Sequence, residues 1–178
     1  MVVWFVSTFA AVVAQRLLEL RLARKNAGAL RKMGGYEVGA DHYPQIVHVH
    51  VLFFAALWSE FFYRQPAVSL WMAVPFSAFL LLQAVRIWCI RSLGLFWNTR
   101  IMVVPGMELV RRGPYRFMKH PNYAVVTLEF LFLPLSFGCF LTAFLFPLLN
   151  VLVLRKRIAA EEAALRAASG HVRGKGVV

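Results

Sequence analysis

The densest group of chemically useful side chains lies in the segment from Arg111 to Tyr123. This short run holds cations, aromatic rings, a histidine and two prolines, and an apolar segment follows it directly. We therefore expect one wall of a cofactor pocket here, at the point where an apolar helix meets water.

A second charged group lies far away in the sequence, near the C-terminus. Arg157 and Glu161 are four residues apart and share a helix face, with Glu162 next to them. An ordinary surface ion pair is one interpretation of this spacing. The other is that this helix folds back beneath His120, so that the two carboxylates accept hydrogen bonds from hydroxyl or ammonium groups and Arg157 pairs with a carboxylate. Periodicity alone does not decide between them.

Further ionisable groups fall within apolar segments, where each costs about 2.5–3.5 kcal/mol at the centre of a membrane helix. Arg16, Glu60 and Arg86 lie near segment ends, which favours snorkelling to the interface or mutual pairing. Glu129 lies about 9 Å deep by helical rise. It should face the interior of a helix bundle, where it either pairs with an arginine or contacts a substrate.

The sequence gives no sign of a metal site. His48 and His50 are two residues apart on an expected helix and so point to different faces. Cys89 and Cys139 both fall inside apolar runs and are typical of small buried side chains, with neither a disulfide pattern nor metal-ligand spacing.

Composition identifies the class of protein. Apolar residues make up 60% of the 178 residues and mean hydropathy is +0.64, against about 45–50% apolar residues in soluble domains. Such a chain could hardly cover a soluble surface with polar groups. The net charge of +12 then fits cytoplasmic loops beside anionic lipid better than a nucleic-acid surface.

The apolar segments that must position these side chains predict an all-α integral membrane protein with five spanning helices in a single domain, 1–178. The expected spans are about 2–20, 46–63, 67–90 (with a kink at Pro75), 123–137 and 139–154. The last two form a hairpin, because one helix over both would extend about 48 Å across a core of about 30 Å. Polar loops are expected over 21–43 and 91–122, and a charged cytosolic helix over 155–169. We expect no removable signal peptide.

The charge pattern agrees with five spans. Of the 20 Lys and Arg residues, all except Arg64 then fall on one side or at the helix ends beside it. The positive-inside rule places that side in the cytoplasm, with the N-terminus outside and the C-terminus inside, in a bacterial inner membrane.

The chain resembles the isoprenylcysteine carboxyl methyltransferase family over nearly its whole length up to about Leu165. The resemblance rests on Gly113-Pro114-Tyr115-Arg116, on Lys119-His120-Pro121-Asn122-Tyr123, on the apolar hairpin, and on Arg157-Ile158-Ala159-Ala160-Glu161-Glu162. Similarity to a small bacterial branch, often encoded beside type III polyketide synthases, rests on Gly34-Gly35-Tyr36-Glu37, His42-Tyr43-Pro44 and the run 93–100. The chain departs from the family pattern at Val125, where a glycine is common, and near Gly170-His171, where a Phe-Gly-x-x-Tyr element is reduced.

The resemblance implies S-adenosylmethionine as methyl donor, bound at the cytosolic face and released as S-adenosylhomocysteine. It implies that the adenosyl pocket is lined by His120, Pro121, Asn122 and Tyr123, with Arg116 nearby. Glu161 and Glu162 would hold the ribose or the methionyl ammonium group, and Arg157 would meet a carboxylate.

The expected reaction is O-methylation of a hydrophobic acceptor, either an isoprenylcysteine-like carboxylate or a polyketide of the alkylpyrone or alkylresorcinol type. A carboxylate acceptor needs only a cation such as Arg157 or Arg100 to orient it, whereas a phenol or enol gains from a base, with Glu129 or His120 as candidates. The alternatives are phospholipid N-methylation, sterol-reductase-like reduction, and a membrane scaffold or transporter without catalysis. Membrane lipids are the other expected partners, and the sequence does not indicate an oligomeric state.

Overall fold

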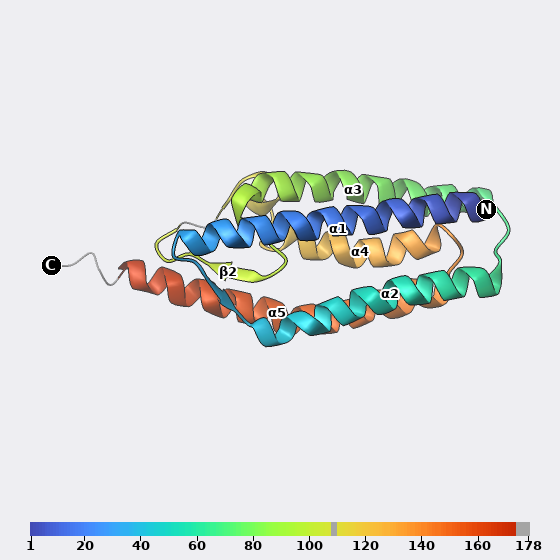
Figure 1. Cartoon of the computed structure of the whole chain (residues 1–178). Coiled ribbons are helices and arrows are strands. Elements are labelled where there is room, and N and C mark those ends of the chain that lie inside the picture. The colour runs from blue at the N-terminus through green and yellow to red at the C-terminus, as the bar shows by residue number, and fades with distance from the viewer. Residues whose placement is uncertain (108–109, 174–178) are drawn as a thin grey trace.

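The computed structural model describes residues 1–107 and 110–173, the side chains of 42 and 168–173 excepted. The described residues contain α1 (Val2–Lys32), α2 (Tyr43–Arg64), α3 (Ala73–Leu93), α4 (Pro121–Leu135) and α5 (Phe140–Arg173). Figure 1 shows two layers, with α1, α3 and α4 in one and α2 and α5 in the other, and successive helices run in opposite directions. The all-helical expectation is confirmed in its main features.

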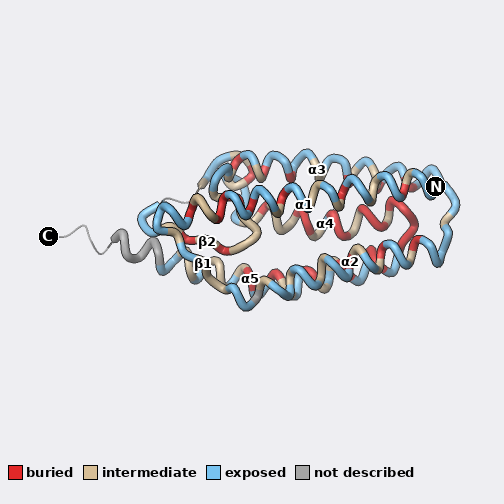
Figure 2. Tube along the Cα trace, viewed as in Figure 1, coloured by how far each residue is buried: buried red, intermediate tan, exposed pale blue. Residues whose placement is uncertain are grey.

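Three helical segments in the described part of the chain are long and apolar enough to cross a membrane, namely Val2–Lys32, Tyr43–Arg64 and Leu70–Phe96, while Pro121–Leu135 is a shorter apolar helix. Large apolar side chains also cover the outside of the bundle, as at Val3 (83% exposed) and Leu81 (69% exposed). In Figure 2 the buried residues face the space between the helices and the outward faces are exposed. These features are those of a membrane protein. The count of five crossings stays a prediction.

The expected first boundary was wrong, because α1 continues to Lys32 through the first half of the loop expected at 21–43. This part of the chain is rich in Arg, Leu, Ala and Lys, all strong helix formers. The polar residues ended the apolar segment without ending the helix, which stops just before Gly34.

The third helix also differs from the expectation. A 3₁₀ turn at Leu70–Met72 precedes α3, so regular α-helix begins six residues later than the expected span at 67. Pro75 is the third residue of α3, and a proline in the first turn removes no hydrogen bond that the helix needs. At this position Pro75 does not interrupt the hydrogen-bond pattern of α3.

The hairpin of the last two apolar segments is confirmed, but its second arm and the charged tail form one helix. α5 runs from Phe140 to Arg173 without a break, about 51 Å by helical rise. The Asn150 amide donates to Thr127 Oγ1 at 2.8 Å and so ties α5 to α4. Glu60 of α2 accepts hydrogen bonds from the backbone N–H groups of Leu141 and Thr142 at 3.0 and 2.7 Å, which satisfies donors in the first turn of α5.

The expected loops contain a small sheet that the sequence did not predict. β1 (Tyr36–Val38) pairs antiparallel with β2 (Ile101–Val103), with Tyr36 opposite Val103. Figure 1 shows β2 at the end of the bundle where α1 finishes, between the two layers. The sheet thus fixes residues 99–103 close to the charged half of α5.

Candidate donor-binding site

The start of α4 and the charged half of α5 meet at one end of the bundle. His120 is the residue that precedes α4, and the buried Pro121 is its first helical residue. His120 Nε2 lies 3.4 Å from Glu162 Oε1, and its Nδ1 lies 3.9 Å from Glu161 Oε2. The contact between these two distant segments, one of two interpretations open from the sequence, is present in the structure.

Tyr123 connects the charged residues of α5. Its ring stacks on His120, with centroids 5.3 Å apart. Its hydroxyl donates to Glu161 Oε2 at 2.5 Å and accepts from Arg157 Nε at 2.8 Å. Arg157 therefore reaches Glu161 through the phenol oxygen, and the three side chains hold one another in a single arrangement.

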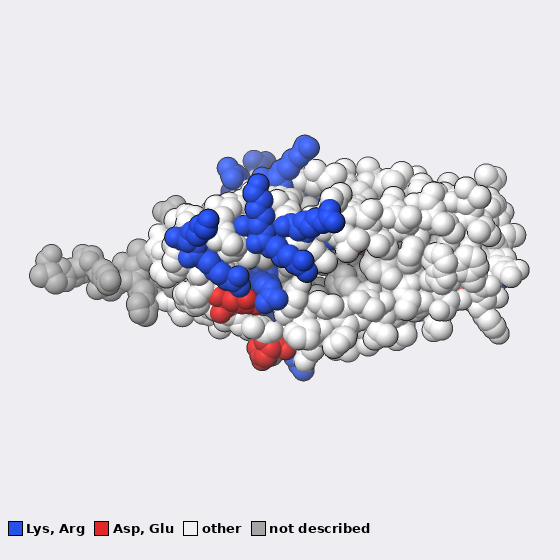
Figure 3. All heavy atoms as spheres, in the orientation of Figure 1, with Lys and Arg blue, Asp and Glu red and all other residues white. Residues whose placement is uncertain are grey.

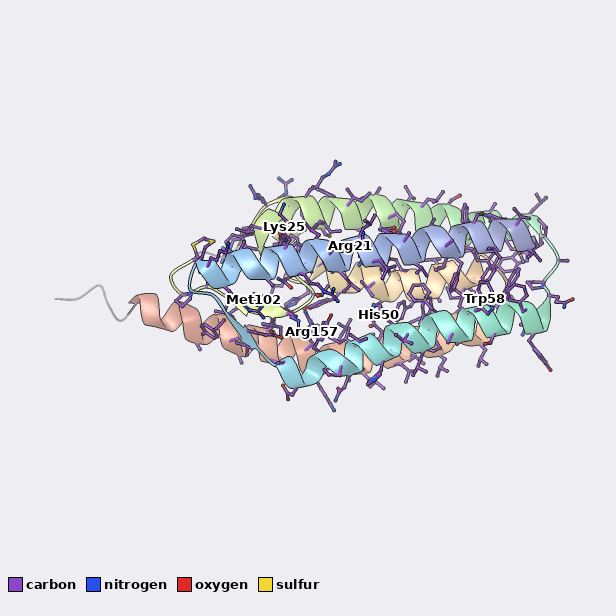
Figure 4. The ribbon with its side chains drawn as sticks, viewed as in Figure 1. Arg21, Lys25, His50, Trp58, Met102 and Arg157 are labelled. Atoms are coloured by element: carbon purple, nitrogen blue, oxygen red, sulfur yellow. The ribbon has the colours of Figure 1, made fainter. Side chains whose placement is uncertain are left out.

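Arg157 also ties α5 to the segment before β2. Its side chain is buried, with 6% of the residue exposed, and its NH2 group donates to the Thr99 carbonyl at 2.7 Å. Figure 4 shows Arg157 at the same end of the bundle as Met102 of β2. The Thr99 carbonyl is a contact that sequence reasoning missed, since backbone atoms leave no trace in residue types.

Glu162 lies close to three basic side chains at this end of the bundle. Besides His120, it lies 3.7 Å from Lys119 Nζ and 3.3 Å from Arg166. The hydrogen bond from His120 is the main reason that the pKa of Glu162 lies below its ordinary value, and the charge of Lys119 adds to it. Glu162 thus stays ionised in mildly acidic conditions.

Asn122 carries a polar atom that the described residues leave unsatisfied. Its Oδ1 is buried and has no hydrogen-bond partner among the described residues, although buried acceptors in folded proteins are nearly always paired. An amino group, such as that of an adenine ring, would satisfy it. Together with carboxylates suited to ribose hydroxyls or an ammonium group, the residues present fit the methyl donor that the resemblance implies. We call His120, Asn122, Tyr123, Arg157, Glu161 and Glu162 the donor cluster.

Two candidate arginines lie outside the donor cluster. The exposed Arg116 stacks on Phe117, with its guanidinium carbon 4.5 Å from the ring centroid. Arg100 donates to Glu37 of β1 at 2.6 Å and lies 4.5 Å from the centroid of the Tyr43 ring. Arg100 thus links the small sheet to the start of α2.

Glu129 belongs to a separate buried cluster within the bundle. Its carboxylate accepts from Arg16 at 2.8 Å, Gln83 at 2.8 Å and Arg86 at 3.1 Å. Arg16 and Arg86 also bind Glu19, at 2.8 and 2.6 Å. The sequence left open whether Glu129 pairs with an arginine, and the structure shows that it does. Arg16 and Arg86 therefore pair with these two glutamates inside the bundle and do not extend to the membrane interface. We call Arg16, Glu19, Arg86 and Glu129 the ion cluster.

The sequence departs from the family pattern at two places, and the structure describes the side chain at the first of them only. Val125 is buried, with 4% of the residue exposed, so a side chain larger than glycine is accommodated there. Gly170-His171 lies in the last part of α5, whose side chains are outside the described residues.

The charge distribution matches the position of the donor cluster. Figure 3 shows lysine and arginine side chains gathered over the half of this face that leads to the C-terminal end, while most of the other half bears no charge. A polar cofactor would thus reach the basic end of the bundle, next to the uncharged surface of the helices.

Comparison with known proteins agrees with this picture. Residues 73–167 match the model of the isoprenylcysteine carboxyl methyltransferase (ICMT) family, and this range contains the whole donor cluster. YpbQ, an uncharacterised protein of Bacillus subtilis (strain 168), is 45% identical over 157 residues, which cover 88% of this chain and 94% of YpbQ.

An uncharacterised protein of Haemophilus influenzae is 24% identical over 159 residues, covering 89% of this chain and 92% of that protein. No solved structure matches the chain. ICMT family members are S-adenosylmethionine-dependent methyltransferases. The family match, which spans more than half of the chain, shows that this protein belongs to the isoprenylcysteine carboxyl methyltransferase family.

Proposed function

We propose that the protein is an S-adenosylmethionine-dependent O-methyltransferase of the bacterial inner membrane that acts on a hydrophobic acceptor at the cytoplasmic face. The observation that carries the proposal is the donor cluster, in which the start of α4 meets the acidic face of α5. Asn122 Oδ1, which is buried and has no hydrogen-bond partner among the described residues, supports the proposal because an amino group of the donor would satisfy it.

Each residue of the donor cluster has a proposed role. Asn122 accepts a hydrogen bond from the adenine amino group, and His120 and Pro121 form the wall beside it. Glu161 and Glu162 accept from the ribose hydroxyls or the methionyl ammonium group. Tyr123 and Arg157 hold Glu161 in place, because the phenol hydroxyl is bonded to both. The bound donor supplies an electrophilic methyl group on a sulfonium.

An enzyme at this position can meet both of its substrates. The donor is water-soluble and reaches the basic end of the bundle from the cytosol. A lipophilic acceptor, either a polyketide of the alkylpyrone or alkylresorcinol type or an isoprenylcysteine-like carboxylate, arrives through the bilayer. Holding the nucleophile about 3–3.5 Å from the methyl group accounts for much of the catalysis in such a displacement.

The test is donor binding to the purified full-length protein in detergent, measured by calorimetry. We expect Glu161→Ala and His120→Ala each to lower the affinity for S-adenosylmethionine at least about tenfold, the loss of about 1.4 kcal/mol for a hydrogen bond to a charged group. His48→Ala and Lys156→Ala, which replace exposed residues, should bind as the wild type does. Equal affinities in all four variants would refute the assignment.

A further inference from the structure

A small cavity lies inside the bundle, apart from the donor cluster. Its volume is about 10 Å³, and it is lined by polar side chains from three helices, Arg16, His50 and Glu129, and by the rings of Phe54, Phe79 and Phe130. A site of this size holds about one water-sized group. A hydroxyl tip would fit, and the aromatic lining suits an apolar body attached to it.

The cavity lies on the same side of α4 as the donor cluster. Phe130 follows Tyr123 by about two turns, so the two rings share a helix face about 10 Å apart. His50 packs edge-on against Phe130, with centroids 5.0 Å apart. Figure 4 places His50 on the side of α2 that faces the other layer. The contact between His50 and Phe130 thus lies about two turns of α4 further into the bundle than Tyr123.

The charges around the cavity are already balanced. The ion cluster pairs two arginines with two glutamates, and each carboxylate binds both guanidinium groups. An incoming carboxylate would therefore be an unpaired charge in a buried site, which is costly. A neutral hydroxyl needs no counter-charge, so the ion cluster discriminates between the two classes of acceptor.

His50 offers a hydrogen-bond acceptor at this site. Its Nδ1 lies 2.8 Å from the Ile46 carbonyl, and a carbonyl can only accept, so the hydrogen must be on Nδ1. In a neutral imidazole the other nitrogen, Nε2, then carries the lone pair. Nε2 has no hydrogen bond to the described residues.

We propose that this cavity receives the hydroxyl group of an enol or phenol acceptor and that His50 Nε2 is its general base. The inference rests on the proposed methyltransferase function and deepens it. The acceptor O–H bond breaks and its proton goes to Nε2. The acceptor oxygen forms a bond to the methyl carbon, the carbon–sulfur bond breaks, and sulfur keeps that electron pair as a neutral thioether. The imidazolium then loses its proton to water.

The experiment compares two histidines on the same helix. His50→Gln removes the proposed base, while His48→Gln changes an exposed residue two positions away. Full-length protein in lipid nanodiscs is given labelled S-adenosylmethionine and a long-chain alkylresorcinol, alkyl-4-hydroxypyrone or farnesylcysteine. Donor affinity, kcat and KM are measured for each acceptor.

We expect the wild type to methylate a hydroxyl acceptor in preference to farnesylcysteine. His50→Gln should lower kcat about 100-fold or more, the usual contribution of a general base, with unchanged donor affinity. The charged groups nearest His50 are Arg16 and Glu129 at the cavity, with Glu19 and Arg86 behind them, and all four stay in place in this variant.

A second variant guards against a folding defect. Phe54→Trp narrows the cavity and keeps the His50 imidazole in the chain, so the acceptor KM should rise while donor affinity stays at the wild-type value. Donor binding with wild-type kcat in His50→Gln, or a preference for the carboxylate acceptor, would overturn this inference alone. Failure of the wild type to bind the donor would instead overturn the proposed function.

Discussion

Tyr123 shows, at the scale of single residues, how the donor cluster is organised. Arg157 and Glu161 have the spacing of a helical ion pair, yet each uses the Tyr123 hydroxyl as its partner. The phenol therefore holds the carboxylate at a fixed place, with its remaining acceptor positions available to a ligand. In a direct ion pair with Arg157, the Glu161 carboxylate would have fewer acceptor positions left for a ligand.

The ionisation of Glu162 predicts how the stability of the protein depends on pH. Because its pKa in the folded protein lies below the ordinary value of 4.5, its contacts stabilise the protein fully above that value. The contribution is lost as pH falls through the lowered pKa. We expect the melting temperature of the wild type to exceed that of Glu162→Gln by a constant amount from pH 7 to about 5, and the gap to close toward pH 3.

The matched comparison is Arg166→Ala. Arg166 lies one turn from Glu162 and is an exposed partner at 3.3 Å, so its loss should change the melting temperature little at any pH. A gap between wild type and Glu162→Gln that stays the same down to pH 3 would contradict the assignment of the stabilisation to the ionised carboxylate.

The sequence indicated which residue types form the donor cluster, but the arrangement required the fold. The pairing of His120 with Glu162 joins positions 42 residues apart. Helical periodicity relates residues within one helix only, so it could not predict this contact. Glu129 could be placed inside the bundle because a lipid-facing carboxylate is costly. Its three partners could not be chosen, since they come from α1 and α3.

At the scale of elements, hydropathy located every helix but misplaced several ends. α1 and α5 continue through charged residues because those residues are good helix formers. The sheet of β1 and β2 was missed because three-residue strands carry too little alternation to be recognised. Apolar residues thus indicate which part of a helix contacts lipid. The helix propensity of the residues that follow decides where the helix ends.

The loop before α4 depends on Gly113. Its φ is +59°, and an added Cβ would lie 2.8 Å from Ser92 Cβ and 3.0 Å from Trp88 Nε1. Gly106 also has a positive φ, +79°, but an added Cβ there meets no atom of the described residues within 4 Å. Gly106→Ala therefore measures backbone strain alone, about 1–2 kcal/mol.

We expect Gly113→Ala to cost about 1–3 kcal/mol more than Gly106→Ala, because it adds overpacking to the same strain. It should also weaken donor binding, since the displaced loop leads directly to His120. Denaturant unfolding in detergent gives the two free energies. Equal losses in both variants would show that Ser92 and Trp88 move aside without cost.

At the scale of the whole molecule, the alternating helices and the charge bias make one topology testable. Every lysine and arginine except Arg64 belongs to the expected cytoplasmic side or to the helix ends beside it. We expect a fluorescent protein fused after residue 178 to be bright and an alkaline phosphatase fused there to be inactive in bacterial cells. The opposite pattern would place the donor cluster outside and remove its access to cytosolic donor.

The ion cluster also has a consequence for biogenesis. While the ribosome is still making the chain, α1 and α3 bring Arg16, Arg86 and Glu19 into the bilayer, which leaves one surplus positive charge. Only the emergence of α4 supplies Glu129, the carboxylate that neutralises it. Nascent chains that stall before α4 therefore keep an uncompensated guanidinium among apolar helices.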